Sequence, residues 1–223
     1  MKIELHFHTD HSSRCGKVNP VDSVAMYREQ GYDAIVVTDH YNTINVDDRF
    51  PGTDMEKTRS WLKGYEQAKA AGDAQGVTVL FGLEARVPGS ENDFLIFGAE
   101  PEFVLENPRL HELDIPRLHA LCRKYNALMI QAHPNRPMCY PVRHEFIDGV
   151  EVSNGNPRQQ NNNARTLAQA EADPRMIRIS GSDFHQIPDL ARGGIVTDRD
   201  VRTNADLLAC LRSGEYELIP IDL

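Results

Sequence analysis

The sequence predicts a single α/β domain in which strands and helices alternate around a closed, mostly parallel sheet. Three observations lead to this fold class. A length of 223 residues suits one small β/α barrel. Short apolar runs alternate with helix-like segments, which implies a parallel sheet that is either closed or open. Metal-binding residue types follow five of these runs, and a closed barrel brings all such ends to one face, which favours the barrel.

Seven short apolar runs are the predicted strands, because each is bounded by turn or polar residues. They span residues 3–7, 34–38, 77–84, 94–98, 127–132, 149–153 and 176–181. The first helix is predicted over 21–30, since Asn19 and Pro20 mark a helix start and Gly31 marks a stop. Apolar residues three and four apart predict further helices over 55–71, 115–125, 158–172 and 205–213. The asparagine-rich segment 153–163 is predicted to be a loop that leads into a helix.

The composition limits the classes of protein that fit this chain. Apolar residues make up 40% and charged residues 26%, as in ordinary globular proteins, and no apolar run reaches transmembrane length. The net charge of -9, without a basic run, argues against long nucleic acid as a partner. The N-terminus lacks a secretory signal, and the four cysteines form no CxxC pair. We therefore expect a cytoplasmic protein with reduced thiols that binds neither a membrane nor long nucleic acid.

Residue types that bind metals follow five of the predicted strands. In chain order they are His6 and His8, His40, Glu84, His133, and Asp183 with His185. Side chains alternate along a strand, so we expect His6 and His8 to project together while Leu5 and Phe7 face the other way. The last pair in the chain repeats this spacing. Side chains placed in this way can chelate a shared ion at the rim of the barrel.

The placement of the histidines favours a metal site over a set of isolated histidines. Any one of them could be satisfied by a backbone carbonyl or by water, and this is our expectation for His111, His119 and His144. Imidazole and carboxylate ligands suit Zn, Mn or Fe, and so many ligands exceed the needs of one tetrahedral ion. We therefore expect two or three divalent ions, with Glu84 as a bridging carboxylate. The histidines that support this expectation are the six of nine that lie at or just past a predicted strand end: His6, His8, His11, His40, His133 and His185.

The motifs HFH, TDH, GLE, AHP and GSDFH, in this order and spacing, resemble those of the PHP family, phosphoesterases named for polymerase and histidinol phosphatase domains. The resemblance runs from Met1 to about His185. It implies a distorted TIM-like (β/α)7 barrel with a trinuclear metal site, and we expect one such domain over 1–223. The ligand sets that it implies are His6, His8, Glu84 and Asp183 for one ion, Glu84 and His133 for a second, and His40 and His185 for a third.

Two positions depart from the commoner pattern of the family. Near position 14, where the family often supplies an Asp or His, this chain has Arg14 and Cys15. Either His11 or Cys15 is then the substitute ligand, unless Cys15 is only a small buried side chain. On the strand after the Glu, where the family commonly has a histidine, this chain offers Asp93. Asp93 is either a ligand of the second ion or a residue that starts a strand.

The chemistry implied by this site is hydrolysis of a small phosphate ester. A hydroxide that bridges two ions attacks phosphorus, because bound metals lower the pKa of water, and no nucleophilic side chain is needed. Arg136, three residues after His133, is the predicted phosphate-binding residue, with Arg14 and Arg143 as further candidates. The alternative for Arg136 is an exposed loop arginine.

Two other functions stay open from the sequence. A barrel with HxH and later His and Asp ligands also suits an amidohydrolase-like enzyme that cuts C–N bonds, although no bridging lysine is evident after the third or fourth strand. A non-catalytic metal-binding domain is the second alternative. The expected partner is a small phosphorylated metabolite. Its identity, the choice between monoesterase and diesterase, the metal and the oligomeric state are not fixed by the sequence.

Overall fold

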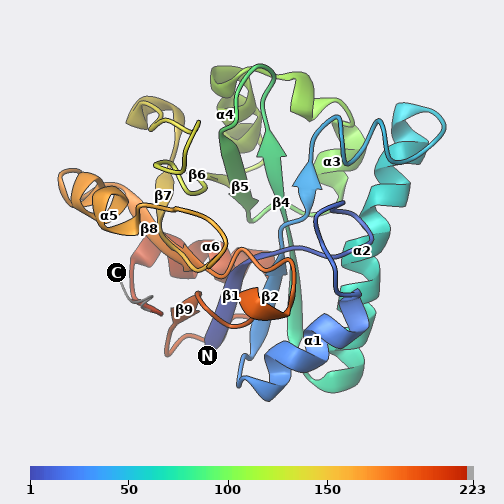
Figure 1. Ribbon diagram of the computed structural model, residues 1–223, viewed down its shortest axis with the longest axis horizontal. Coiled ribbons are helices and arrows are strands. Elements are labelled where there is room, and N and C mark those ends of the chain that lie inside the picture. The colour runs from blue at the N-terminus through green and yellow to red at the C-terminus, as the bar shows by residue number, and fades with distance from the viewer. Residues whose placement is uncertain (220–223) are drawn as a thin grey trace.

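The computed structural model describes residues 1–219, which fold around one curved sheet (Figure 1). The strands follow the order β10-β9-β1-β2-β4-β5-β6-β7-β8, and β3 pairs with β4. All seven predicted strands are confirmed, as β1, β2 and β4 to β8. The strand bounds are β1 Lys2–Phe7, β2 Ala34–Val37, β3 His40–Tyr41, β4 Thr78–Arg86, β5 Asp93–Phe97, β6 Leu128–Gln131, β7 Gly149–Asn154, β8 Ile177–Gly181, β9 Ile195–Val196 and β10 Glu217–Leu218.

The sheet closes into a barrel beside the end of β1. Phe7, the last residue of β1, forms a parallel bridge with Phe184, which follows β8. The backbone N–H of His8 donates to the Phe184 carbonyl at 3.0 Å, and that of Phe184 donates to the His6 carbonyl at 3.1 Å. This closure confirms the predicted barrel. It also joins the segment that carries His6 and His8 to the segment that carries Asp183.

Strand β5 distorts the barrel because it runs against its neighbours. Pairing is parallel for β1–β2, β2–β4, β6–β7 and β7–β8, whereas β5 is antiparallel to both β4 and β6. The chain therefore passes from β4 to β5 by a short loop instead of a helical crossover. Asp93, the first residue of β5, lies opposite Arg86 at the end of β4. The start of β5 thus lies at the rim that the ends of its neighbours form.

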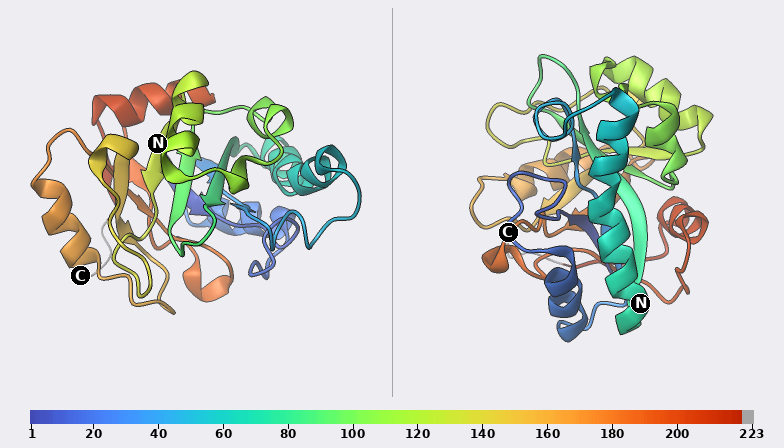
Figure 2. Two further views of the ribbon diagram at one scale, coloured as in Figure 1. Left: turned by 90° about the horizontal axis from the view of Figure 1, so that it is seen from above. Right: turned by 90° about the vertical axis from the view of Figure 1, so that its right-hand side faces the viewer.

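Within residues 1–219, six α-helices accompany the sheet, and Figure 2 shows α2 running along the side of the barrel. The predicted helices are confirmed as α1, α2, α4 and α6. The prediction for α5 was wrong at its start. Asn161 donates to the backbone oxygens of Asn154 and Asn156, which holds residues 158–162 in a loop. None of the described helices is long and apolar enough to cross a membrane. The helix bounds are α1 Pro20–Glu29, α2 Asp54–Gln75, α3 Glu102–Glu106, α4 Ile115–Lys124, α5 Asn163–Glu171 and α6 Asn204–Ser213, with 3₁₀ turns at Leu110–Glu112, His144–Phe146 and Ile187–Asp189.

Buried apolar side chains form three clusters around and inside the sheet. One joins strand residues such as Leu5 and Leu95 to α6, a second joins Phe7 to α1 and α2, and a third lies between β4 to β6 and α2 to α4. Leu5 and Phe7 therefore pack in different clusters, and the prediction that they face the same way was wrong. The physical reason is an irregularity in β1, whose register against β2 shifts between Glu4 and Phe7.

Candidate metal centre

The predicted ligands other than His11 converge at one rim of the barrel. They come from β1, β3, β4 and β5 and from the segments that follow β1, β6 and β8. This convergence is what the alternation of strands and helices predicts for a closed barrel. Four overlapping groups have ligand atoms within 4.8 Å of one another: His6, His8 and Asp183; His6, Glu84 and His133; His40, Glu84 and Asp93; and His8, His40 and His185.

Glu84 lies at the centre of this cluster and is fully buried. Its Oε1 lies 3.3 Å from His6 Nε2 and 3.2 Å from His133 Nε2. Its Oε2 lies 3.3 Å from His8 Nε2 and 2.8 Å from His40 Nδ1. Each carboxylate oxygen therefore faces two imidazoles. This geometry suits a carboxylate that two metal ions share.

Asp183 divides its two oxygens between the cluster and an arginine. Its Oδ1 lies 3.4 Å from His6 Nε2 and 3.5 Å from His8 Nε2. Its Oδ2 accepts a hydrogen bond from Arg136 Nη2 at 2.7 Å. Arg136 Nε in turn donates to Asn161 Oδ1 at 3.0 Å. One carboxylate oxygen is thus directed at the imidazoles while the other is held by a fixed cation.

Two of these residues have a backbone conformation that is rare outside glycine. The φ angle is 30° at His133 and 52° at Asp183. Each residue lies two positions after the last residue of a barrel strand, where the chain turns at the rim. Such conformations cost about 1–3 kcal/mol each and gather at functional sites. The surrounding barrel therefore holds both residues in a strained turn that presents their side chains to the cluster.

Buried polar atoms at the centre of the cluster test whether these residues fit a metal. Within the described part of the chain, His6 Nε2, His8 Nε2, His40 Nδ1 and Glu84 Oε2 are buried and make no hydrogen bond of suitable geometry, although they lie close to one another. Buried polar atoms are nearly always paired, so a set that faces one point needs an explanation. Imidazole nitrogens and a carboxylate oxygen are ligands of Zn, Mn and Fe. The residues therefore fit divalent metal ions.

The electrostatics of the metal-free cluster favour ionised carboxylates and a neutral His8. Burial raises the pKa of Glu84, but His40 and His6 outweigh it and hold that pKa well below its usual range. Burial is likewise outweighed at Asp183, where His6 and Arg136 hold the pKa well below normal. Burial, together with His185 and His40, keeps the pKa of His8 well below its usual value. The two carboxylates are therefore ionised and His8 is neutral. At His6 and His40, burial lowers the pKa, but neighbouring carboxylates outweigh it and hold that pKa well above its usual value, so a metal ion would release protons from these rings when it binds.

Glu151 in β7 supports the cluster from behind and was not predicted. It is buried, and its Oε1 lies 2.8 Å from His6 Nδ1. Its Oε2 accepts from the backbone N–H of His133 at 3.1 Å and from Asn154 Nδ2 at 2.9 Å. A carboxylate behind a ligating histidine fixes the ring orientation and raises its basicity. The one signal in the sequence is an acidic residue inside the apolar run GVEVS.

His11 is not part of the cluster, which corrects one sequence prediction. Its Nε2 lies 3.1 Å from the backbone oxygen of Ser60 in α2, and its ring stacks on Phe50. Arg49 holds the His11 carbonyl through Nε at 2.8 Å. The imidazole is thus turned towards α2 by local contacts. A position just past a strand end does not by itself direct a side chain to the rim.

Cys15 and Asp93, the other two positions that the sequence left open, both lie next to histidines of the cluster. Cys15 is exposed, so it is not the small buried side chain of the alternative prediction. Desolvation of its thiol raises the pKa, but interactions with His40 and His185 outweigh this and lower the pKa to about 6. Asp93 Oδ2 lies 3.9 Å from His133 Nε2. Both oxygens of Asp93 also bind Arg86, through Nε at 2.8 Å and Nη2 at 2.7 Å.

The three arginines predicted to bind phosphate lie in different places. Arg136 is at the cluster, paired with Asp183, and its side chain is 17% exposed. Arg14 Nη2 donates to the backbone oxygen of Asp48 at 2.8 Å, and Arg143 pairs with Glu145 at the surface. Arg136 alone among the three contacts a residue of the cluster through these bonds. The three histidines expected to lack a role, His111, His119 and His144, face Asp47, Asp148 and Asp173 outside the cluster.

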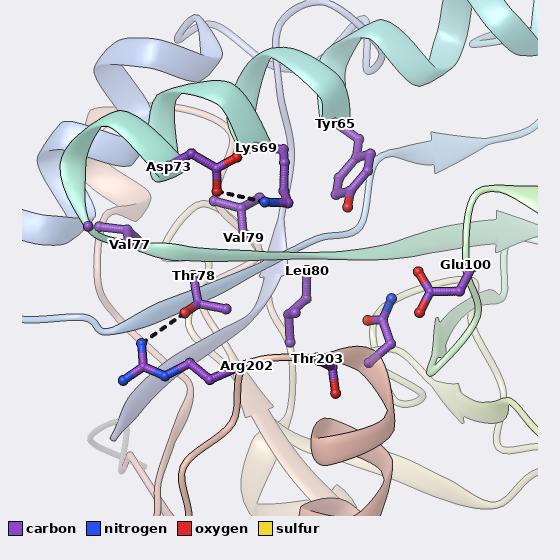
Figure 3. Close-up of a pocket in the computed structure, with 13 residues that line it drawn as sticks. Tyr65, Lys69, Asp73, Val77, Thr78, Val79, Leu80, Glu100, Arg202 and Thr203 are labelled. Atoms are coloured by element: carbon purple, nitrogen blue, oxygen red, sulfur yellow. Dashed lines mark hydrogen bonds and ion pairs between the residues drawn. The ribbon is translucent and has the colours of Figure 1, made fainter.

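A polar hollow of about 450 Å³ lies elsewhere on the molecule, between α2, the start of β4 and the start of α6 (Figure 3). Lys69 pairs with Asp73 on one side of it, and Arg202 donates to Thr78 Oγ1 on the other. Thr78 is the first residue of β4, whereas Glu84 is near its last. The hollow is therefore at the opposite end of the barrel from the cluster.

The fold and the cluster together define a class: an α/β barrel with a rim of His, Asp and Glu side chains that could hold metal ions. The PHP domain matches residues 4–190 of this chain, and the chain belongs to the PHP domain family. One curated relative, the DNA polymerase III PolC-type of Latilactobacillus sakei subsp. sakei (strain 23K), is 33% identical over 87 residues. That match covers 39% of this chain and 5% of the polymerase.

Solved structures share the fold at low sequence identity. A two-domain Bacteroides vulgatus protein described as containing a predicted PHP-like metal-dependent phosphoesterase matches with a TM-score of 0.67 and 18% identity, over 98% of this chain and 64% of that one. PsfC from Pseudomonas syringae matches with a TM-score of 0.65 and 17% identity, over 93% and 87%. An amidohydrolase from Chromobacterium violaceum matches with a TM-score of 0.56 and 15% identity, over 83% and 88%. At these identities the likeness shows the fold alone.

Proposed function

We propose that this chain hydrolyses a small phosphate ester with two or three divalent metal ions at the rim cluster. The observation that carries the proposal is the position of Glu84, a buried carboxylate whose two oxygens face four imidazoles at 2.8 to 3.3 Å. The family and a structural neighbour described as a metal-dependent phosphoesterase support this class of reaction. When bound, such ions lower the pKa of water to supply a nucleophile and neutralise phosphate oxygens.

The distances suggest which residues hold each ion. His6, His8, Asp183 and one oxygen of Glu84 would hold the first, and His133, Asp93 and Glu84 would hold the second. The third would lie among His8, His40 and His185, and the Cys15 thiol, which interacts with His40 and His185, is a further candidate ligand. Nitrogen, oxygen and sulfur ligands in this combination suit Zn, Mn or Fe.

Arg136 would orient the substrate. Its guanidinium is held by Asp183 and Asn161, so its position does not depend on a bound phosphate. It remains 17% exposed at the rim, which leaves part of the guanidinium open to an incoming anion. Its Nε donates to Asn161 and its Nη2 to Asp183 and Asn154, so Nη1 would donate a charge-assisted hydrogen bond to a phosphate oxygen. With water as the attacking group, no nucleophilic side chain is needed.

Metal analysis and a screen of phosphorylated metabolites test this proposal. We expect the wild-type protein to hold divalent metal and to release phosphate from at least one small monoester or diester. His8→Ala should lose metal and activity, whereas the exposed His144→Ala should keep both. The same screen includes amides and lactones, because hydrolysis of these compounds instead of phosphate esters would identify an amidohydrolase-like enzyme. Metal binding without turnover of any ester would point to a non-catalytic domain.

A further inference from the structure

The loop after β1 places two neighbouring buried serines in different surroundings. Ser12 and Ser13 are both fully buried. The Ser12 hydroxyl donates to the backbone oxygen of Trp61 in α2. The Ser13 hydroxyl instead lies within 3.2 Å of the His8 ring and also contacts His40. Of these two hydroxyls, only that of Ser13 touches residues of the cluster.

The hydrogen bonds of Ser13 determine which ring nitrogen of His8 carries a proton. A hydroxyl has one proton to donate and two lone pairs that accept. Ser13 Oγ donates to Asp39 Oδ1 at 2.7 Å and accepts the backbone N–H of His40 at 3.0 Å. The second lone pair faces His8 Nδ1 at 3.2 Å. Nδ1 of the neutral ring must therefore carry the proton, so Nε2 presents its lone pair to the centre of the cluster.

Asp39 fixes the direction of the Ser13 hydroxyl because Asp39 acts only as an acceptor. Its Oδ1 also accepts the backbone N–H of Thr9 at 2.8 Å, and its Oδ2 accepts the Thr9 hydroxyl at 2.7 Å. Asp39 is 1% exposed, so water does not compete for these positions. The Thr9 backbone N–H, the Thr9 hydroxyl and the Ser13 hydroxyl thus all donate to this carboxylate. The Ser13 proton is therefore committed to Asp39 and cannot turn towards His8.

We propose that Ser13 is a positioning residue that holds His8 in the Nδ1–H tautomer for metal binding, with Asp39 setting the direction of its hydroxyl. The proposal rests on the proposed function in so far as it takes His8 to be a metal ligand. Two other rings are held in the same way by groups that can only accept. His6 Nδ1 faces Glu151 at 2.8 Å, and His185 Nδ1 faces the backbone oxygen of Asp183 at 2.9 Å. The Ser13 hydroxyl differs from these groups because it can also donate. It acts as an acceptor towards His8 because its own proton is bound to Asp39.

A titration of the metal-free full chain with zinc compares Ser13→Ala with Ser12→Ala. Both variants lose one buried hydroxyl from the same loop, so both should lose some thermal stability. We expect Ser13→Ala to bind zinc about 10- to 100-fold more weakly, as is typical when the group behind a ligating histidine is removed. Ser12→Ala should bind zinc as the wild type does. Equal affinity in the two variants would overturn the proposal.

Nitrogen-15 NMR of the histidine rings gives a second readout that a merely structural role would not move. In metal-free wild-type protein we expect His8 to carry its proton on Nδ1, and in Ser13→Ala we expect a mixture of tautomers. A wild-type His8 with its proton on Nε2 would overturn the proposal, even if Ser13→Ala does not fold. If both measurements agree with expectation and no ester is hydrolysed, the proposed function fails and the role of Ser13 stands.

Discussion

Asp183 and Asp93 are both buried aspartates at the barrel rim, and each pairs with an arginine, but the two pairs leave different groups for a metal. Asp183 gives only Oδ2 to Arg136, at 2.7 Å, and directs Oδ1 at two imidazoles. Asp93 gives both oxygens to Arg86, at 2.8 and 2.7 Å. A two-point bond between arginine and carboxylate is among the stronger and more directional hydrogen-bonded pairs in proteins.

Because of this difference, the ligands beside Asp183 and those beside Asp93 are not equally available to a metal ion. On the side of Asp183, a free carboxylate oxygen and unpartnered imidazole nitrogens already face one point. On the side of Asp93, an ion would have to share the carboxylate with Arg86, which already neutralises its charge. We therefore expect the ion beside Asp183 to bind more tightly than the ion beside Asp93.

The largest expected effect compares Asp183→Asn with Asp93→Asn. Asp183→Asn removes the charge from an oxygen directed at His6 and His8, so metal affinity and activity should both fall more than about 100-fold, beyond the loss typical of groups behind a ligand. Asp93→Asn should weaken only one ion, by about 10-fold, because Arg86 already neutralises that carboxylate. Metal content after dialysis and initial rates of ester hydrolysis measure both effects.

A control for this comparison is Asp173→Asn, which changes an aspartate that pairs with Arg175 at the surface. It should leave metal content and activity as in the wild type. If Asp93→Asn loses as much metal as Asp183→Asn, the two sides are equivalent and the comparison fails.

A smaller effect is expected from Arg86→Met, which releases Asp93. Without its arginine, the buried Asp93 carboxylate loses its two-point partner and keeps the imidazole of His133 at 3.9 Å, so the metal-free protein should lose about 1–2 kcal/mol of unfolding free energy, a figure reduced because Arg86 is 32% exposed. The same change frees both carboxylate oxygens for an ion. We expect the weaker metal ion to bind about 10-fold more tightly, the equivalent of about 1.4 kcal/mol.

Denaturant unfolding with and without metal, and metal titration, test Arg86→Met. Arg143→Met is the matched control, since Arg143 pairs with Glu145 and both side chains are largely exposed. Weaker metal binding in Arg86→Met would mean that Arg86 orients Asp93 for the ion instead of competing with it.

Local patterns in the sequence predicted seven of the ten strands that the structure describes, and most of the cluster. Each of these seven is a short apolar run, and the ends of parallel barrel strands meet at one rim, so Glu84, His133 and Asp183 converge without any knowledge of long-range contacts. The direction of β5 could not be predicted in the same way, because an apolar run has the same composition read from either end. Its reversal is what brings Asp93 to the rim.

Contacts behind the cluster were beyond sequence reasoning for a different reason. Glu151 in β7 contacts His6 in β1, and Ser13 after β1 contacts Asp39 after β2, so these partners depend on how segments far apart in the sequence pack. His11 shows the converse. It lies just past a strand end, as the ligands do, yet its ring bonds to α2 because the loop turns it away from the rim.

The smallest expected effect concerns Cys15, which lies at the edge of the cluster beside His40 and His185. In cobalt-loaded protein a thiolate ligand gives a sulfur-to-metal charge-transfer absorption in the near ultraviolet, which imidazole and carboxylate ligands do not give. We expect Cys15→Ser to lose this absorption while the ions held by Asp183 and Glu84 stay bound, because neither residue depends on the thiol. His11→Ala should keep the absorption, since His11 bonds to Ser60 instead of the cluster. An unchanged spectrum in Cys15→Ser would exclude the thiolate and leave the third ion to imidazoles alone.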